Sequence, residues 1–178
     1  MAKIVPESHQ ALHAIAEEVP IKEIASPRIQ KIIKDMRAVL RSYEGGEFTG
    51  VAIAAPQIGI PLRIFLIEDM GSAVPDTPRL PALVAINPHL VKLSKKKMLV
   101  HEGCLSVENS YGTVVRSTRA TLRAHDEHGK KYERGASNLL AQIFQHETDH
   151  LDGILFLDRA KDIIEKDMSL PKRASKKS

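Results

Sequence analysis

The segment QHETDHLDG, residues 145–153, constrains the fold more than any other part of the chain. His146 and His150 are four residues apart, so on an α-helix they lie one turn above each other and can bind one metal ion. Glu147 then lies beside the ion, where its carboxylate can take a proton from a metal-bound water. Two surface histidines would show the same spacing, so this segment alone leaves both readings open.

The residues around the two histidines favour a helix. Apolar residues recur at helical spacing through the segment, namely Leu139, Leu140, Ile143, Phe144 and Leu151. Ser137 or Asn138 can cap the start of this helix, and Gly153 lies where a helix commonly ends. Because Leu139 and Ile143 continue the face that carries the histidines, the metal is expected at a partly buried wall.

Two imidazoles leave a catalytic metal centre incomplete, because such centres usually hold three protein ligands and keep one position for water. The only cysteine, Cys104, lies in the sequence EGCLS and is the natural third ligand. A lone cysteine is more often a small packing residue. Gly103 permits close backbone approach beside it, yet this segment alone also leaves both readings open.

A third stretch, GVAIAAPQIG at residues 50–59, favours the functional reading. Its small residues permit tight backbone packing, and the Gln57 amide can donate a hydrogen bond to a carbonyl oxygen. Together with EGCLS and QHETDH, in this order and at these separations, it resembles the three signature motifs of the peptide deformylase family. The resemblance spans roughly residues 5 to 160, and the joint occurrence is far more specific than any single motif.

The resemblance implies a metal site. Cys104, His146 and His150 would hold one divalent ion and leave a fourth position for water. The thiolate would offset more of the ion's charge than a third imidazole would. Fe(II) is the metal expected from the family, and Zn, Ni or Co could also occupy such a site.

The resemblance also implies a reaction, the removal of the formyl group from N-formyl-methionyl peptides to give formate and a free N-terminus. Glu147 would accept and later return the proton, and the Gln57 side chain and Leu105 backbone N–H would donate to the formyl oxygen. The residues expected to contact the substrate are Gly50, Val51, Ala52, Gly103, Leu139 and Ile143.

Three positions depart from the family pattern. Ala52 replaces the second glycine of a Gly-x-Gly, Gln142 occupies a helix position that is usually apolar, and Tyr111 stands where an arginine often occurs. These departures leave open a changed acyl-peptide specificity or a non-catalytic, ribosome-associated module. A generic HExxH metallopeptidase would share the helix, but it needs neither AAPQ nor EGCLS.

Composition indicates one ordinary domain, predicted at residues 1–165, because the 178-residue chain is 43% hydrophobic and 27% charged. With one cysteine, no leader pattern and no long apolar run, the expected location is the cytoplasm, without membrane contact. Residues 166–178 are predicted to form a disordered basic tail, for which transient ribosome contact is the alternative role. The absence of Trp argues against base stacking, and no sequence-specific nucleic acid binding is expected.

The rest of the pattern predicts an α+β fold, with antiparallel strands surrounding a central metal-binding HExxH helix. Ser26 and Pro27 open a helix with apolar residues at 3.6 spacing, and a shorter helix is expected at residues 9–19. Strands are expected at residues 62–68, 84–87, 90–93, 98–101, 113–116, 120–125 and 131–134. Residues 69–81 are predicted to form a loop, residues 95–97 an exposed turn, and residues 161–168 a last helical turn.

Overall fold

The computed structural model describes residues 2–43, 50–68 and 80–165. Its helices are α1 (Pro27–Arg41) and α2 (Asn138–Leu151), with short 3-10 turns η1 (Gln10–Leu12), η2 (Ile21–Glu23), η3 (Ala55–Ile58) and η5 (Phe156–Asp158). The strands are β1 (Ala52–Ala54), β2 (Ile64–Ile67), β3 (Leu83–Leu93), β4 (Lys97–Cys104), β5 (Val107–Ser117), β6 (Arg119–His125), β7 (Lys131–Ser137) and β8 (Ile163–Glu165). The predicted basic tail and most of the predicted loop at residues 69–81 lie outside the described residues.

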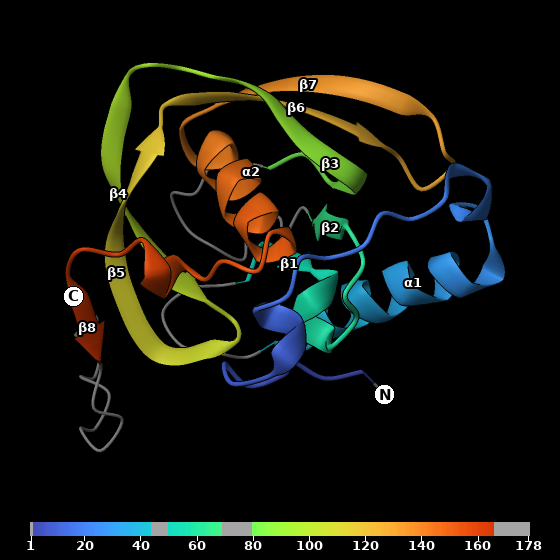
Figure 1. Cartoon of the computed structure of the whole chain (residues 1–178), viewed down its shortest axis with the longest axis horizontal. Coiled ribbons are helices and arrows are strands. Elements are labelled where there is room, and N and C mark those ends of the chain that lie inside the picture. The colour runs from blue at the N-terminus through green and yellow to red at the C-terminus, as the bar shows by residue number, and fades with distance from the viewer. Residues whose placement is uncertain (1, 44–49, 69–79, 166–178) are drawn as a thin grey trace, which may run out of the picture.

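The strands form two antiparallel sheets around α2 (Figure 1). A five-stranded sheet has the order β1-β2-β3-β6-β7, and a three-stranded sheet has the order β4-β5-β8. α2 lies at the centre of the molecule between them, and α1 lies at its edge. The predicted α+β class with a central helix is therefore confirmed. Within the described ranges, no helix has the length and apolar run needed to cross a bilayer.

β2 shows why the two helices lie on opposite faces of the larger sheet. Its four residues are all apolar and buried, as expected of a strand covered on both faces. Ile64 and Leu66 pack in the cluster that includes the buried side of α1. Phe65 and Ile67 point the other way, into the cluster that includes Phe144 of α2. The sheet thus separates α1 from the helix that carries the histidines.

α1 forms where the sequence predicts it. The Ser26 side chain accepts a hydrogen bond from Ile29 N at 3.4 Å, and Pro27 occupies the first turn. The predicted apolar face of the helix is buried, and its buried residues are Ile29, Ile32, Ile33, Met36, Val39 and Leu40. This burial fixes α1 against the sheet.

Long-range polar contacts hold α2 in place. The Gln145 side chain accepts a hydrogen bond from Ser117 N at 2.9 Å and donates to Ser117 O at 3.0 Å, so it pairs with the β5 backbone. At the other end, the buried Arg63 guanidinium contacts Leu151 O and the Asp152 carboxylate. These contacts fix both the rotation and the C-terminal end of the helix.

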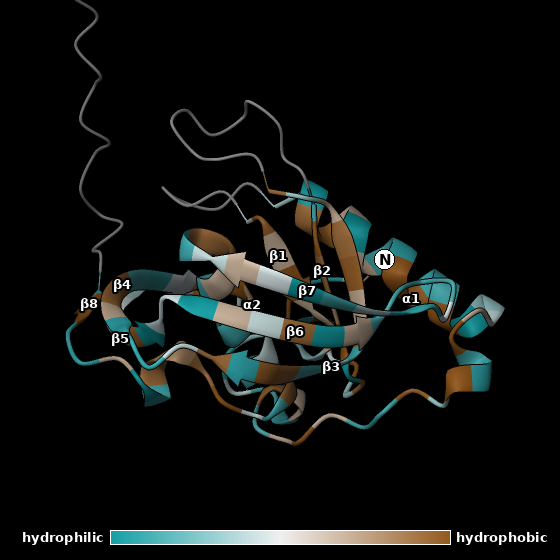
Figure 2. Ribbon diagram, turned by 90° about the horizontal axis from the view of Figure 1, so that it is seen from above, coloured by the Kyte–Doolittle hydropathy of each residue, from teal (hydrophilic) through white to brown (hydrophobic). Residues whose placement is uncertain are grey.

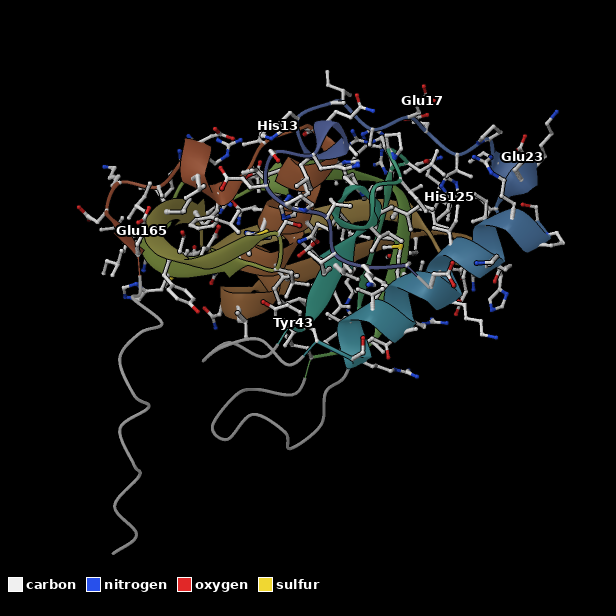
Figure 3. The ribbon with its side chains drawn as sticks, turned by 90° about the horizontal axis from the view of Figure 1, so that it is seen from below. His13, Glu17, Glu23, Tyr43, His125 and Glu165 are labelled. Atoms are coloured by element: carbon white, nitrogen blue, oxygen red, sulfur yellow. The ribbon has the colours of Figure 1, made fainter. Side chains whose placement is uncertain are left out.

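The helix predicted at residues 9–19 is wrong beyond the single turn η1. Ala16 N donates to Leu151 O, and Glu17 N donates to Pro61 O, both at 2.9 Å. Because these backbone groups bond to distant segments, they cannot form a helical ladder. Figure 3 shows His13 and Glu17 along this segment as it runs toward Glu23 and α1.

The helical turn predicted at residues 161–168 is also wrong over residues 161–165, and residues 166–168 lie outside the described residues. Residues 163–165 form the short strand β8, which pairs with residues 110–112 of β5. The two strands predicted at residues 84–87 and 90–93 are one strand, β3, with register shifts between them. Asn87 has a φ of 49° in this irregular region, and its side chain bonds both Val19 N and Val19 O at 2.8 Å.

Candidate metal centre

Three side chains converge at the centre of the molecule. Cys104 ends β4, and His146 and His150 lie one turn apart on α2. The ligand atoms that these three residues offer all lie within 4.8 Å of one another. Cys104 Sγ is 3.3 Å from His150 Nε2. The structure therefore brings together the thiol and the two imidazoles that the sequence analysis grouped.

This donor set fits a divalent transition metal. Zinc-type bonds of about 2.0–2.3 Å to nitrogen and sulfur place neighbouring ligand atoms a few ångströms apart, as they are here. Burial alone would raise the pKa of the Cys104 thiol, but the nearby His150 and His146 imidazoles lower it to about 5. The thiolate is the form of cysteine that binds metals, so this environment favours the binding form.

Glu102 of β4 orients His146. Its Oε2 lies 3.0 Å from His146 Nδ1, which leaves Nε2 as the nitrogen available to a metal. Both oxygens of the carboxylate also accept hydrogen bonds from Arg116, each at 2.8 Å. Although burial opposes ionisation, these bonds from Arg116 and His146 lower the pKa of Glu102 to about 2. Glu102 is therefore a charged, fixed acceptor for the imidazole.

The ion pairs continue from Arg116 to the surface. Arg116 also contacts the Asp149 carboxylate of α2, and Arg159 lies 2.7 Å from the same carboxylate. Only 5% of the Arg116 side chain and 2% of the Glu102 side chain are exposed, whereas 44% of Arg159 is exposed. The partners of Arg116 lie 14 and 33 residues away along the chain, so neither pair has a local sequence signal.

Glu147 lies on α2 between the two histidines and is almost completely buried. Its Oε2 has no hydrogen-bond partner among the described residues. Burial raises the pKa of Glu147, against the opposing effect of the His146 and His150 charges. A buried carboxylate oxygen without a partner is costly, and its place beside three potential ligands makes it a candidate proton acceptor.

Gln57 lies on the other side of Cys104. Its Oε1 accepts a hydrogen bond from Ala54 N at 2.8 Å, which fixes the orientation of the amide. Its Nε2 then points to Cys104 Sγ, 3.4 Å away. The amide group therefore reaches the candidate centre as a donor, although the two residues are far apart in the sequence.

The two glycines expected at the substrate site are closely surrounded. A Cβ atom added to Gly50 would lie 3.0 Å from side-chain atoms of both Leu105 and Leu40. A Cβ atom added to Gly103 would lie 2.9 Å from Cδ1 of Tyr111, because the ring covers the glycine on the neighbouring strand. The Tyr111 ring therefore leaves no room for a side chain at residue 103.

Five other positions of interest lie on α2 or in the strand and loop beside it. Ala52 is buried in the cluster beneath α2, so its methyl group belongs to the core. Val51 and Leu139 are partly buried against the same cluster, and Ile143 is part of it. The side chain of Gln142 does not enter this cluster, because its amide donates to the His101 carbonyl of β4 at 2.9 Å. That bond ties α2 to the smaller sheet.

Comparison with known proteins gives one consistent family. The family model for polypeptide deformylase matches residues 1–166. Peptide deformylase 1A of Arabidopsis thaliana, described as chloroplastic/mitochondrial, is 41% identical over 89% of the chain, which covers 61% of that plant protein's length. A peptide deformylase of Fusobacterium nucleatum is 38% identical and aligns with 98% of the chain and 95% of its own length. The chain therefore spans about three fifths of the plant relative and nearly the whole bacterial one.

Solved structures agree with this result. A class I type b peptide deformylase from Acinetobacter baumannii, crystallised with Met-Ala-Ser, has a TM-score of 0.79 at 32% identity, covering 88% of the chain and 96% of its own. A peptide deformylase from Thermotoga maritima has a TM-score of 0.77 at 27% identity, and the match covers 91% of the chain and 99% of the Thermotoga protein. In both comparisons the similarity covers about nine tenths of the chain.

Proposed function

Because the chain belongs to the peptide deformylase family, we propose that it is a metal-dependent hydrolase that removes the formyl group from N-formyl-methionyl peptides. The products would be formate and a free N-terminal methionine. The observation that carries the proposal is the convergence of Cys104, His146 and His150, whose ligand atoms lie within 4.8 Å. A fold likeness without this cluster would support only the fold.

We propose that these three residues hold one divalent ion, with Fe(II) as the expected metal and Zn, Ni or Co as alternatives. When bound, the ion supplies Lewis acidity at the position that the three ligands leave open. The thiolate moderates that acidity by its charge. Glu102 supports the site by keeping His146 in one tautomer and one orientation.

We propose that Glu147 accepts a proton from the attacking water and later gives it to the departing amine. Its burial and raised pKa support this role, because a general base works best when its pKa approaches the working pH. Gln57 Nε2 and the Leu105 backbone N–H would donate hydrogen bonds to the formyl oxygen as negative charge develops on it. The bond from Ala54 to Gln57 Oε1 supports this assignment, since it orients the amide before substrate arrives.

We propose that the methionine side chain binds against the apolar wall formed by Val51, Leu139 and Ile143. The peptide backbone would lie along Gly50, Ala52 and Gly103. The similar Acinetobacter baumannii protein was crystallised with Met-Ala-Ser, which supports a substrate that begins with methionine. The burial of the Ala52 methyl group within the core removes one reason to expect a changed specificity.

The proposal is tested by formate release from formyl-Met-Ala-Ser, using anaerobically purified protein that carries about one Fe(II) or Ni(II) per chain. Acetyl-Met-Ala-Ser is the matched substrate, and mass spectrometry follows the peptide. Formate with an intact Met-Ala-Ser product supports a deformylase. Cleavage between residues of the peptide would indicate a general metallopeptidase, release of acetate a changed acyl specificity, and no reaction a non-catalytic module.

We also propose that residues 1–165 form one catalytic domain that acts in the cytoplasm. The tail at residues 166–178 would contact the ribosome transiently through the four cations of its last seven residues, Lys172, Arg173, Lys176 and Lys177. Cosedimentation with ribosomes, compared between the wild type and a variant with these four residues changed to Gln, tests that contact. Equal cosedimentation of both would contradict it.

A further inference from the structure

A shallow hollow of about 500 Å³ lies on the face of the larger sheet that points away from α2. Figure 2 looks onto β6 and β7 from this side, with α2 behind them. Strands β3, β6 and β7 and the residues that follow β3 line the hollow: Lys92, Ser94, Arg119, Ala120, Thr121, Gly135, Ala136 and Ser137. It contains no acidic residue and has no part in the proposed reaction.

The register of the strands explains the hollow. Thr121 pairs with Lys92 on one side and with Gly135 on the other, so these three residues share one face. A Cβ atom added to Gly135 would meet nothing within 4 Å, so the centre of the face is open. Arg119 and Ser137 form the next pair on the same face. Two cationic side chains therefore flank a floor of small residues.

Hydrogen bonds fix a lysine-rich turn beside this hollow. The Lys96 carbonyl accepts a bond from Thr118 N at 3.0 Å and another from Ser94 Oγ at 2.9 Å. Ser94 Oγ also accepts a bond from Arg119 N at 3.1 Å. The exposed residues Lys95, Lys96 and Lys97 are therefore held close to Arg119 by contacts between the two turns.

The cations of this surface have no carboxylate partners. Among the described residues, no acidic side chain forms an ion pair with Lys92, Lys95, Lys96, Lys97 or Arg119. Farther along the same face, Arg123 is paired with Glu133 at 3.2 Å. Five cations without an ion pair thus lie at the hollow and the adjacent turn, a pattern typical of a surface that binds a polyanion.

Hydroxyl groups accompany the charges. The side chains of Thr121 and Ser137 form no hydrogen bond with the described residues, although Ser137 is the N-cap residue of α2. Because the lining includes no Phe, Tyr or Trp, the surface offers nothing on which unpaired bases could stack. The backbone of an RNA double helix offers phosphates, which cations bind, and ribose 2′-hydroxyls, which can form hydrogen bonds with protein hydroxyl groups.

We propose that this surface binds double-stranded RNA through its phosphate and ribose groups, without sequence preference. Lys92 and Arg119 bind phosphates at the hollow, and Lys95, Lys96 and Lys97 bind phosphates beside it. None of the residues that line the hollow is among the residues proposed for catalysis. The wide, shallow minor groove of RNA displays its 2′-hydroxyls, which a protein surface carrying hydroxyl groups can contact.

The test is fluorescence anisotropy of a labelled RNA duplex titrated with the full-length, metal-loaded protein at several salt concentrations. The double variant Lys92→Gln/Arg119→Gln should bind more weakly, and the slope of log affinity against log salt should fall by about 2. The matched control is Lys22→Gln/Lys34→Gln, which removes two exposed cations outside this surface. It should retain the affinity and salt slope of the wild type.

Substitution of Gly135 gives an independent test that keeps all the cations. Gly135→Glu places a carboxylate in open space at the floor of the hollow, and Gly135→Gln places a neutral side chain of the same size there. The Glu variant should lose RNA binding, and the Gln variant should retain most of it. Both should keep the thermal midpoint and the formate release of the wild type, which separates binding from folding.

Four results would overturn the proposal. The wild type could fail to bind the RNA duplex at 50 mM salt, a concentration at which multiple phosphate contacts are strong. The Lys92→Gln/Arg119→Gln and Gly135→Glu variants could bind like the wild type. Binding could also be lost only when the four cations of the last seven residues, Lys172, Arg173, Lys176 and Lys177, are changed to Gln. Equal affinity for a DNA duplex of the same length would overturn the assignment to RNA.

Discussion

Glu102 Oε2 lies 3.0 Å from Nδ1 of His146, and the same carboxylate accepts two hydrogen bonds from Arg116. A chain of alternating charges therefore links the candidate centre to Asp149 and, at the surface, to Arg159. Burying such charges costs free energy, and removal of one partner leaves the next charge buried without compensation. These linked ion pairs fix the orientation of the His146 ring.

Changing Glu102 to Gln tests the role of these linked ion pairs. The amide has the size of the carboxylate but no charge, so His146 loses its anionic acceptor and Arg116 retains only Asp149. Metal affinity is expected to fall about 10- to 100-fold, as for other supporting contacts of metal ligands. Competition with a chelator measures the affinity. Glu133→Gln is the matched control, because it removes only the exposed pair with Arg123. Equal affinity in both variants would contradict the role of Glu102.

The thiol of Cys104 is expected to ionise at low pH in metal-free protein. Its pKa in the folded chain is about 5, below that of an unfolded chain. The unfolded chain therefore binds more protons between the two values, and this group's contribution to stability is lost as the pH falls through about 5.

Alkylation of Cys104 measures this pKa directly, because the chain has no other cysteine. The rate of reaction with iodoacetamide should rise with a midpoint near pH 5 in the folded, metal-free protein. In denaturant the midpoint should move to about 8.5, the value of a free thiol. The same midpoint in both states would show that the imidazoles do not stabilise the thiolate.

Gln57→Glu is expected to lower kcat while leaving one metal bound. A carboxylate cannot donate to the formyl oxygen, and loss of one such donor typically costs about 100- to 1,000-fold in kcat. Steady-state formate release and metal analysis give the two readouts. Gln10→Glu makes the same chemical change at an exposed position and should behave like the wild type. A kcat within a few-fold of the wild type would exclude Gln57 as a donor.

Gly103→Ala should destabilise the protein, because the new methyl group would lie 2.9 Å from the Tyr111 ring. Overpacking of this kind costs roughly 1–3 kcal/mol, measured here by urea unfolding. Tyr111→Ala should remove most of this penalty in the double variant. Gly135→Ala is the control, since nothing lies within 4 Å of its added Cβ, and it should not destabilise. Equal effects of the two glycine substitutions would contradict the fit of Gly103 to Tyr111.

Much of the architecture follows from local sequence signals. Ser26 and Pro27 define the start of α1, and the apolar period predicts which side of it is buried. The two histidines of α2 and the single cysteine were grouped from their motifs, and the structure brings their side chains together. The turn at Lys95 and Lys96 is exposed, as its charges predict.

The remaining features depend on contacts between distant residues. The segment around Ala16 has apolar spacing, yet its backbone bonds to Leu151 and so cannot be helical. Arg63 and Gln145 fix the position of α2 through partners 88 and 28 residues away, and neither has a local pattern that indicates such a role. Asp149 resembles an ordinary helix-end residue until Arg116 is placed beside it.

The most direct test of the account compares the wild type with Glu147→Gln, each carrying about one Fe(II) or Ni(II) per chain. The substitution keeps the size of the side chain and removes its ability to accept the proton. The account predicts equal metal content in both proteins, formate from formyl-Met-Ala-Ser with the wild type, and almost none with the variant. Formate release at the wild-type rate by the metal-loaded variant would contradict it.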